Sequence, residues 1–384
     1  MKKLAATLII CIFLVFGINY LTRSDSLKNK IINLIQLEEI QEDELNNQYT
    51  DYWYKTLNDD EKQLYRIIAK GVKDLEKNIT VKFSKEKSIK GGKQAIEKVL
   101  NAIFADNPDV FYIKDTYEIS ITNLLVLNKI DLKLEYISNN INEIEKMKQE
   151  LNAEIERINN QLIGCKTDYE KELLLHDILA KDIVYFEHES ENEIPSIKHT
   201  AYSALVNKSA VCDGITKAFQ LILSKNNIES IFVTGESENV SHAWCKVKLD
   251  ENYYNVDVTS DKALNKENNN LVIHSYFNIT DKEIMNTHEF DNYDKLPKSA
   301  ENKYNYYVYN DYTISYMDNF EYKLGQIIQK QKNNNLLEFK ATGMNEVPSK
   351  MVESLYNLNF NNYKANHITK VEYNQINDNY IVEK

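Results

Sequence analysis

Apolar residues recur every three or four positions in several segments of the first half of the chain, which is the period of an α-helix. One segment begins with Asn58, has Glu61 three residues later and continues with apolar residues to Val72. This pattern predicts a capping box followed by an amphipathic helix. A second helix is predicted from residue 93 and should end before Pro108, because the residue that precedes a proline avoids the helical conformation.

Alternation of apolar and polar residues replaces the helical spacing in residues 117–137. Alternation predicts half-buried strands, and its interruption around Asn128 predicts that two strands turn there to form a β-hairpin. Together with the preceding helices, the hairpin indicates an α+β region that extends from about residue 45 to about residue 138.

From Ile141 to Leu162 the spacing of apolar residues is helical again. The pattern covers only about three heptads, so a helix packed on its own domain is favoured over a dimeric coiled coil. The next segment, 169–186, predicts a further amphipathic helix that carries His176 beside three leucines. We therefore expect His176 to be a histidine at the edge of the core rather than a ligand.

The segment "AVCDGITKAFQLILSKNNIES" predicts another amphipathic helix, and Cys212 lies at its start. Two strand-like segments, 242–249 and 253–259, follow it in the chain. Alternation along the first of these strands puts His242 and Trp244 on one face.

The position of Asp257 depends on the turn between these two strands. If Asp250 and Glu251 form a two-residue turn, Trp244 lies opposite Asp257, and Asp257 shares the face of His242. His242 and Asp257 are then diagonal neighbours with their backbones ~7–8 Å apart, which allows a hydrogen bond between the imidazole and the carboxylate. A three-residue turn would send Asp257 to the other face, so the hypothesis requires an even loop or a compensating bulge.

The C-terminal part of the chain predicts a small α+β module without a catalytic signature. Its tyrosines are candidates for binding glycan or peptide, although strand propensity and packing explain them adequately. The predicted elements are a tyrosine-rich strand pair from Tyr304 to Ser315, a helix at 317–332, a strand at 336–342, a helix at 348–358 and a hairpin at 367–384.

The composition is that of an ordered protein, since 43% of the 384 residues are hydrophobic and the chain has only 9 glycines and 4 prolines. Long flexible linkers are therefore not expected. The formal net charge of −12 argues against nucleic acid as the main partner, because phosphate groups are bound by clustered lysine and arginine side chains.

The N-terminal segment changes the expected compartment. Lys2 and Lys3 precede the uncharged stretch from Leu4 to Leu21, whose length fits a signal peptide or one membrane-spanning helix. No small-x-small cleavage site follows it, so we predict an uncleaved anchor with most of the chain outside the cell. The alternative is a cleaved signal and a secreted protein.

The cysteines do not form a disulfide framework or a zinc site. Cys11 lies in the apolar N-terminal segment, which leaves Cys165, Cys212 and Cys245, an odd number without a Cys-x-x-Cys pair. At least one exported thiol is therefore expected to be free. A metal site that combines Cys212, His242, Cys245 and Asp257 is disfavoured, because alternation turns Cys245 away from His242. No metal or other cofactor is expected.

The remaining pattern is a thiol at a helix start, a histidine and a carboxylate, which are the groups needed for acyl transfer. Cys212 would attack a carbonyl carbon, since the N-terminal end of a helix stabilises a thiolate. His242 would accept and return the proton, and Asp257 would fix the tautomer of the ring. The backbone N–H of Cys212 is a candidate donor to the oxyanion, a contribution worth up to ~4 kcal/mol.

The stretches "HTAYSALVNKSAVCDGITKAFQLILSKNNIESIFVTG" and "SHAWCKVKLDENYYNVDVTSD" resemble the core of the transglutaminase-like superfamily, a papain-related cysteine fold. The resemblance implies an α+β protein in which a helix packs on an antiparallel sheet, flanked by smaller α+β regions and an N-terminal membrane helix. It implies that Cys212 is the nucleophile, His242 the base and Asp257 the acid. It also marks Trp244 as a wall of the site and Tyr202 as a residue near the nucleophile, with core packing as the alternative for both.

Three positions depart from the family pattern. Cys245 stands where an asparagine is usual, Ser260 replaces an aromatic residue, and Asp213 precedes Gly214 where a Gly-Tyr pair is common. A carboxylate at Asp213 is expected to oppose formation of the Cys212 thiolate. None of these changes removes a member of the triad.

These observations predict an extracytoplasmic, membrane-anchored cysteine acyltransferase or peptidase of the cell envelope. It would cleave or transfer amide bonds of peptide or protein substrates through a thioester on Cys212. The alternative is a catalytically silent transglutaminase-like scaffold or binding module. The predicted divisions are an anchor or signal segment (1–24), an N-terminal α+β region with the long helix (25–165), a catalytic domain (166–298) and a C-terminal α+β module (299–384).

Overall fold

The structure is a computed structural model of the chain. The predicted anchor, residues 1–24, and the helix predicted at 348–358 lie outside the residues that it describes. None of the helices in the described part of the chain has the length and hydropathy needed to cross a bilayer. The described residues are 50–84, 92–123, 127–187, 194–263, 271–332, 334, 336–343, 370–374 and 379–383.

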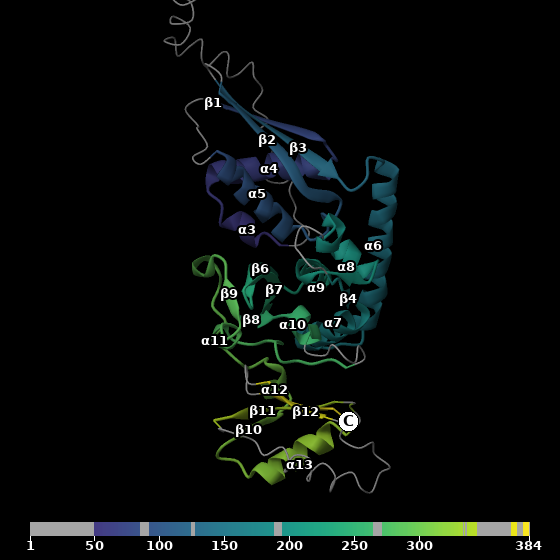
Figure 1. The fold of residues 1–384 in the computed structure, drawn as a ribbon, viewed down its shortest axis with the longest axis vertical. Helices are drawn as coiled ribbons and strands as arrows, with labels where there is room; N and C mark the ends of the chain where they lie inside the picture. The colour runs from purple at the N-terminus through teal and green to yellow at the C-terminus, as the bar shows by residue number, and fades with distance from the viewer. Residues whose placement is uncertain are drawn as a thin grey trace, which may run out of the picture. The chain divides into compact units, whose positions relative to one another are not determined.

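The described residues form a mixed α and β structure with two compact units (Figure 1). The first unit includes Asp51–Phe104 and Tyr112–Ile141, and the second includes Ala105–Phe111 and the chain from Asn142 onward. The domain boundaries predicted from the sequence stay predictions.

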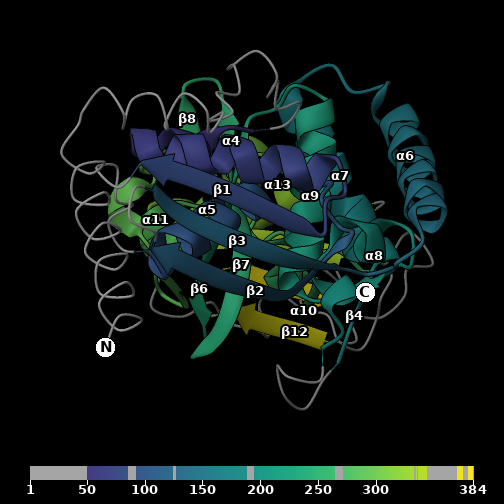
Figure 2. The same ribbon diagram turned by 90° about the horizontal axis from the view of Figure 1, so that it is seen from above.

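The first unit is built on a three-stranded antiparallel sheet in the order β1-β3-β2, which Figure 2 shows side by side. Along β3, buried Ile130, Leu132 and Leu134 alternate with more exposed residues, as expected for a sheet that is covered on one face. Its elements are α3 (Tyr52–Lys55), α4 (Asp59–Lys73), β1 (Asn78–Ser84), α5 (Lys93–Asp106), β2 (Ile113–Asn123) and β3 (Leu127–Tyr136).

The predicted capping box at the start of α4 is confirmed. The side chain of Asn58 accepts a hydrogen bond from Glu61 N at 3.0 Å, and the Glu61 carboxylate accepts one from Asn58 N at 3.0 Å. The predicted hairpin also forms, but its turn precedes Asn128, because Asn128 pairs with Asn123 at the end of the ladder.

The long helix α6 (Ile141–Leu162) belongs to the second unit from Asn142 onward, and its bounds agree with the predicted helix. Ile144, Leu151, Ile155 and Ile158 are buried along one side, which is the pattern of a helix packed on its own unit. In the described residues up to 300, the second unit also has the helices α7 (Asp168–Asp182), α8 (Ala201–Leu205), α9 (Cys212–Lys225), α10 (Val258–Ala263) and α11 (Asp281–Ile284), and the 3₁₀ turns η3 (Ser196–His199) and η4 (Tyr293–Lys295).

A four-stranded antiparallel sheet in the order β8-β7-β6-β9 forms the centre of this unit. Helix α9 lies against β7 and β6, which confirms the prediction of a helix packed on an antiparallel sheet (Figure 1). The strands are β6 (Ser230–Ser237), β7 (Val240–Leu249), β8 (Asn252–Val256) and β9 (His288–Phe290); β4 (Val184–Tyr185) and β5 (Ser209–Ala210) form a separate parallel pair.

The C-terminal part forms a second four-stranded sheet in the order β10-β11-β13-β12, in which β10 and β11 are parallel. The predicted strand at 336–342 and the predicted C-terminal hairpin are confirmed. The elements are α12 (Tyr306–Tyr309), β10 (Thr313–Ser315), α13 (Phe320–Lys330), β11 (Leu336–Thr342), β12 (Lys370–Asn374) and β13 (Asn379–Glu383).

The predicted tyrosine-rich strand pair is wrong in its first half, since residues Tyr306–Tyr309 form a helical turn. Asn305 caps this turn, because its side chain accepts hydrogen bonds from Tyr307 N and Val308 N. The cap outweighs the strand propensity of consecutive tyrosines.

Candidate active site

Cys212 is the first residue of α9 and is partly exposed. N–H groups in the first turn of a helix have no acceptor within the helix, so the backbone N–H of Cys212 is free of intrahelical bonds. The hydroxyl of Thr216 lies 2.8 Å from the Cys212 carbonyl oxygen and 3.0 Å from the carbonyl oxygen of Ala243 on β7. This hydroxyl therefore ties the start of α9 to the strand that carries His242.

Gly214 allows another segment to approach this helix start closely. A β-carbon at position 214 would lie 2.5 Å from the carbonyl oxygen of Lys198, in the turn η3. Any larger residue would push η3 away from the first turn of α9. The glycine two positions after Cys212 is thus explained by close backbone packing.

The charge of Asp213 is compensated by two neighbours. Its carboxylate accepts a hydrogen bond from His199 Nδ1 at 2.9 Å and lies 3.5 Å from Lys217 Nζ. Burial alone would raise the pKa of Asp213, but Lys217 and His199 outweigh it and lower that pKa. The expected opposition of Asp213 to the Cys212 thiolate is therefore offset by nearby positive charge.

His242 and Asp257 form a direct hydrogen bond, with 2.7 Å between Nε2 and Oδ2. The turn has two residues, because Leu249 pairs with Asn252, and the ladder continues to the pair Cys245–Val256. Asp257 follows immediately after the last paired residue of β8, before α10 begins. The predicted even turn is confirmed, and it brings Asp257 to His242.

Asp257 is buried and held by groups from the start of α10. Its Oδ1 accepts hydrogen bonds from the backbone N–H groups of Thr259 and Ser260, each at 3.0 Å. Its Oδ2 accepts a further bond from the Ser260 hydroxyl. Ser260, which stands where the family usually has an aromatic residue, thus positions the carboxylate.

The charges of this pair favour a protonated imidazole. Burial opposes protonation of His242, but the Asp257 carboxylate outweighs it, and the pKa of His242 is raised to about 10. The Cys212 thiol acts on the pKa of His242 in the same direction as Asp257. Burial would raise the pKa of Asp257, yet His242 and His288 hold it well below its ordinary value.

His288 is a further member of this cluster, and no pattern in the sequence predicts its partner. Its Nε2 lies 3.0 Å from Asp257 Oδ2, and its Nδ1 lies 2.8 Å from the Thr287 hydroxyl. It reaches Asp257 because β9 pairs with β6. Gly235 makes this pairing possible, since a β-carbon there would lie 1.9 Å from the carbonyl oxygen of Glu289.

Trp244 and Tyr202 are both buried, and Trp244 lies beside this cluster. Trp244 is 0% exposed, donates to Asn255 Oδ1 at 3.2 Å, and packs its ring 6.2 Å from that of His242. Tyr202 donates its hydroxyl hydrogen to Glu150 at 2.6 Å, and burial raises its pKa to about 12. The assignment of Trp244 and Tyr202 to the substrate site stays a prediction.

The other described cysteines lie apart from this chemistry. Cys245 is buried, its thiol lies 3.8 Å from the Thr216 carbonyl oxygen, and burial raises its pKa. Burial and the charge of Glu170 also raise the pKa of Cys165. Cys165, Cys212 and Cys245 are all free thiols.

Residues 156–258 match the family model of the transglutaminase-like superfamily, which confirms the resemblance found in the sequence. The matched segment is about a quarter of the chain, and it contains Cys212, His242 and Asp257. No curated protein matches the chain.

Among solved structures, the chain is similar to a candidate cysteine protease from Cytophaga hutchinsonii, with 10% identity and a TM-score of 0.25 over 38% of this chain and 62% of that protein. It is also similar to a protein described as a TGase, with 12% identity and a TM-score of 0.30 over 63% of this chain and 59% of that protein. The chain thus spans about three fifths of the length of each relative. A similarity this distant carries no conclusion about activity.

Proposed function

We propose that this chain, whose residues 156–258 match the transglutaminase-like superfamily, is a cysteine acyltransferase or peptidase that acts on amide bonds of peptides or proteins. The observation that supports the proposal most strongly is the 2.7 Å hydrogen bond between His242 and the buried Asp257. Cys212, the first residue of α9, contributes to the raised pKa of the same imidazole.

The residues divide the reaction into two steps. Cys212 Sγ attacks the carbonyl carbon of the substrate amide, its proton is held by His242, and the oxyanion accepts a hydrogen bond from Cys212 N–H. The C–N bond then breaks, His242 gives the proton to the leaving amine, and a thioester remains on Cys212. Water or a second amine attacks the thioester, His242 takes the proton of the attacking group and returns it to sulfur, and an acid or a new amide is released.

The electrostatics of the cluster favour a charged imidazole at His242. With a pKa of about 10, His242 holds its proton at neutral pH. A positively charged ring beside a cysteine at a helix N-terminus stabilises the thiolate, which is the form that attacks carbonyl carbon. Ser260 and His288 keep Asp257 in place for this purpose.

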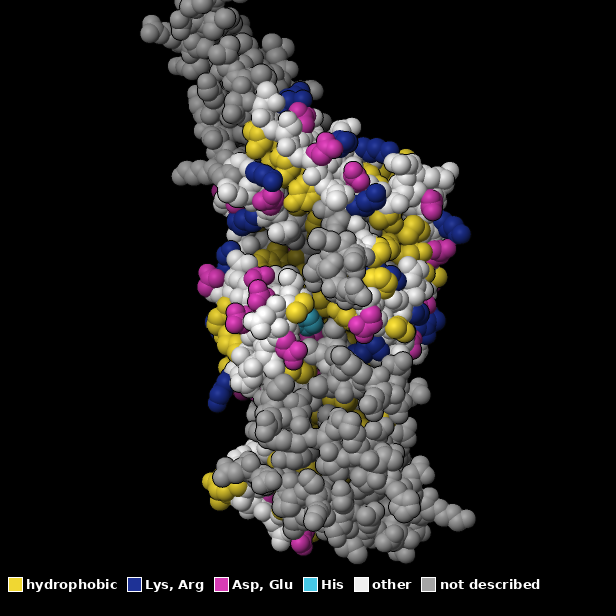
Figure 3. Space-filling model, viewed as in Figure 1, with side chains coloured by type: hydrophobic (Ala, Val, Ile, Leu, Met, Phe, Trp, Pro, Cys, Tyr) yellow, Lys and Arg dark blue, Asp and Glu magenta, His cyan; other side chains and the backbone are white. Residues whose placement is uncertain are grey.

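We further propose that the protein acts outside the cell on peptide or protein amides, attached to the membrane through residues 1–24. The uncharged stretch from Leu4 to Leu21 supports the attachment. Basic and acidic side chains are intermixed over the described residues of the face in Figure 3. That face therefore offers no continuous basic path for a phosphate backbone.

Alkylation of the full chain by iodoacetamide near neutral pH tests the reactive thiol. Cys165 and Cys245 are internal references in the same molecule, and mass spectrometry reads each site separately. We expect Cys212 to react at least about 10-fold faster than either reference, because it is the first residue of a helix and the proposed partner of His242, whereas burial raises the pKa of both reference thiols. His242→Ala should remove this preference. Equal, slow labelling of all three cysteines would refute the proposed nucleophile.

Incubation with a peptide library and a labelled primary amine tests the reaction, with Cys212→Ala as the matched control. Hydrolysed peptides identify a peptidase or amidase, and incorporation of the amine identifies an acyltransferase. Either product should be absent in the control. If Cys212 labels preferentially but no product forms from any peptide, the amide chemistry is refuted and a binding module is favoured.

A further inference from the structure

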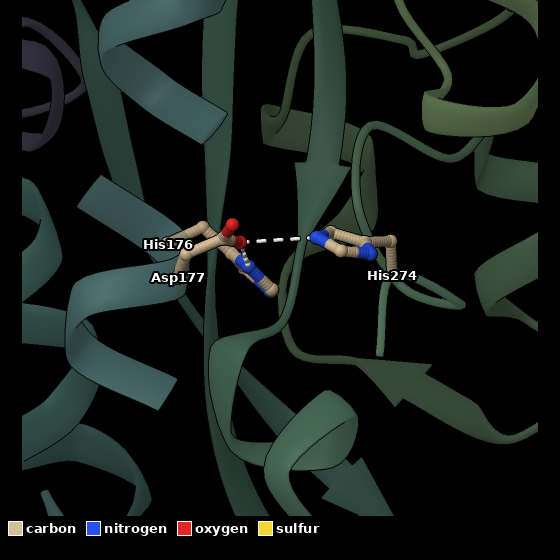
Figure 4. Close-up of side chains that lie close together, drawn as sticks. All are labelled: His176, Asp177 and His274. Carbon is tan, nitrogen blue, oxygen red and sulfur yellow. Dashed lines mark hydrogen bonds and ion pairs between the residues drawn. The ribbon is translucent and has the colours of Figure 1, made fainter. Parts of the chain in front are cut away.

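A second cluster of two imidazoles and a carboxylate lies outside the candidate active site. His176 and Asp177 are adjacent residues on α7, and His274 precedes Tyr276 in the segment that leads to α11. Figure 4 shows the carboxylate of Asp177 between the two rings. Its Oδ1 lies 3.2 Å from His176 Nδ1 and 3.0 Å from His274 Nε2.

We propose that His176, Asp177 and His274 form a binding site for a divalent transition-metal ion of the zinc type. The three ligand atoms lie within 4.8 Å of one another. Two ligands ~2.1 Å from an ion, at roughly 90° to 109°, are ~3.0–3.4 Å apart, which matches the two nitrogen–oxygen distances in the cluster. Two imidazole nitrogens and one carboxylate oxygen are ligands that suit Zn²⁺ and its transition-metal neighbours.

The outer nitrogen of each ring faces its own carboxylate. His176 Nε2 lies 3.1 Å from Asp261 Oδ2, and His274 Nδ1 lies 2.8 Å from Glu338 Oε2. Histidines that bind metals usually donate their second ring N–H to a carboxylate, which fixes the tautomer and increases the basicity of the ligating nitrogen. In both rings the nitrogen that faces Asp177 is therefore the one left to bind an ion.

Those outer carboxylates are themselves held in place. Asp261 Oδ1 accepts a hydrogen bond from Tyr276 N at 2.9 Å, and Glu338 Oε1 accepts bonds from His274 N and the Tyr307 hydroxyl, each at 3.1 Å. Rigid second partners preorganise the ligands, so little rearrangement is needed when the ion binds.

The cluster is buried on one side and reaches solvent on the other. The side chain of His176 is 0% exposed and that of His274 is 7% exposed, whereas that of Asp177 is 31% exposed. Within the described part of the chain, Asp177 Oδ2 accepts no hydrogen bond, so this oxygen is available to an ion or to its water ligand. An ion can therefore enter from the Asp177 side.

The role inferred for the ion is structural. Its ligands come from α7 and from the segment before Tyr276, and Glu338 extends the connection to β11 in the C-terminal sheet. An ion bound by residues so far apart in sequence holds their elements together. Because the ion binds only to the folded chain, it stabilises the folded state. The proposal does not depend on the activity of Cys212.

The test uses the full chain with Cys212→Ala, which removes the thiolate as a competing ligand. After treatment with a chelator, the chain is titrated with Co²⁺, whose visible absorption reports coordination by the protein, and then with Zn²⁺. We expect one equivalent of Co²⁺ to bind and Zn²⁺ to displace it. Zn²⁺ at about 100 times its Kd should raise the unfolding temperature by at least about 2 °C.

Two variants locate the ion. Asp177→Asn keeps the shape and one acceptor, and His274→Gln removes one imidazole; each should abolish the Co²⁺ spectrum while circular dichroism remains that of the parent. Asp257→Asn is the matched control at the other cluster and should leave the Co²⁺ spectrum unchanged. Failure of the parent to bind either ion overturns the proposal. Retention of the spectrum in both Asp177→Asn and His274→Gln, or its loss in Asp257→Asn alone, also overturns it.

Discussion

The second unit contains two clusters in which an aspartate lies between two histidines, and their surroundings differ. In the first, Asp257 accepts hydrogen bonds from His242, His288, Ser260 and Thr259, so both of its oxygens are engaged. In the second, Asp177 meets His176 and His274 through one oxygen. The outer nitrogens of these two rings face further carboxylates, whereas in the first cluster the outer nitrogen of His288 faces the Thr287 hydroxyl.

This difference shows that the chemistry of a His–Asp–His cluster is set by what surrounds it. Where hydrogen-bond donors saturate the carboxylate, that group orients an imidazole, and a thiol on the other side of the ring becomes the reactive group. Where carboxylates bind the outer nitrogens of both rings, the inner nitrogens point toward the third carboxylate, that of Asp177. Such an arrangement of nitrogen and oxygen acceptors suits a cation. Four predictions separate the two clusters.

The largest expected effect is a reciprocal loss of function. Cys212→Ala should lower turnover of the library-identified substrate by at least about 10⁴-fold, because the nucleophile is removed, and should leave Co²⁺ binding unchanged. Asp177→Asn should abolish Co²⁺ binding and change turnover less than about threefold. Steady-state rates and Co²⁺ absorption measure the two. Loss of both properties in either variant would show that the clusters are not independent.

The next effect concerns the carboxylate of the first cluster. Asp257→Asn should lower turnover by about 10³- to 10⁴-fold, since the amide no longer stabilises the imidazolium and favours the wrong tautomer. It should also lower the unfolding temperature, because the buried rings of His242 and His288 lose a charged acceptor. Steady-state kinetics and thermal melts test both. Wild-type turnover in this variant would contradict the assigned acid.

A matched pair of substitutions compares the supporting residues. His288→Gln removes one donor to Asp257 and should slow alkylation of Cys212. The effect should be only about 3- to 10-fold, because Asp257 keeps its other donors. Glu338→Gln should weaken Co²⁺ binding by about 10- to 100-fold, as expected when the outer partner of a ligating histidine is lost. Each variant should leave the other property as it is. A crossed result would assign the residue to the wrong cluster.

The last prediction concerns the dependence of stability on pH. The pKa of His242 in the folded chain is about 10, above its ordinary value of 6.5, so the stabilisation it brings is full below pH 6.5 and is lost as the pH rises toward 10. Between pH 6 and pH 10 the loss should be on the order of a few kcal/mol. Asp257, Cys212 and the His288 ring, centred 5.2 Å away, are the titratable groups that face this imidazole.

Denaturant unfolding at several pH values measures this loss, with His242→Gln as the control. The free energy of unfolding of the control should decline less as the pH rises, because it lacks the His242 imidazole. Groups elsewhere titrate in both proteins, so their contributions cancel in the difference between the two. Parallel declines would mean that His242 does not carry the raised pKa in the folded protein.

The places of Cys212, His242 and Asp257 in their elements could be predicted because local rules fix each one. Helical spacing places Cys212 at the start of α9, and alternation places His242 on its face of β7. The two-residue turn after Leu249 then decides the face of Asp257. The error at Tyr306–Tyr309 also has a local cause. The strand propensity of the tyrosines predicts a strand, whereas the Asn305 side chain caps a helical turn there.

The sequence by itself therefore determined the longer helices, the hairpin of β7 and β8 with its register, and the three groups proposed for catalysis, because each depends on neighbours within one helix or one hairpin. Only the tertiary structure decided that His288 supports Asp257 and that His274 meets Asp177. Pairing of β9 with β6, and of the segment before Tyr276 with α7, joins residues that are distant in sequence. No periodicity in the sequence encodes such contacts, because they follow from how the whole core packs.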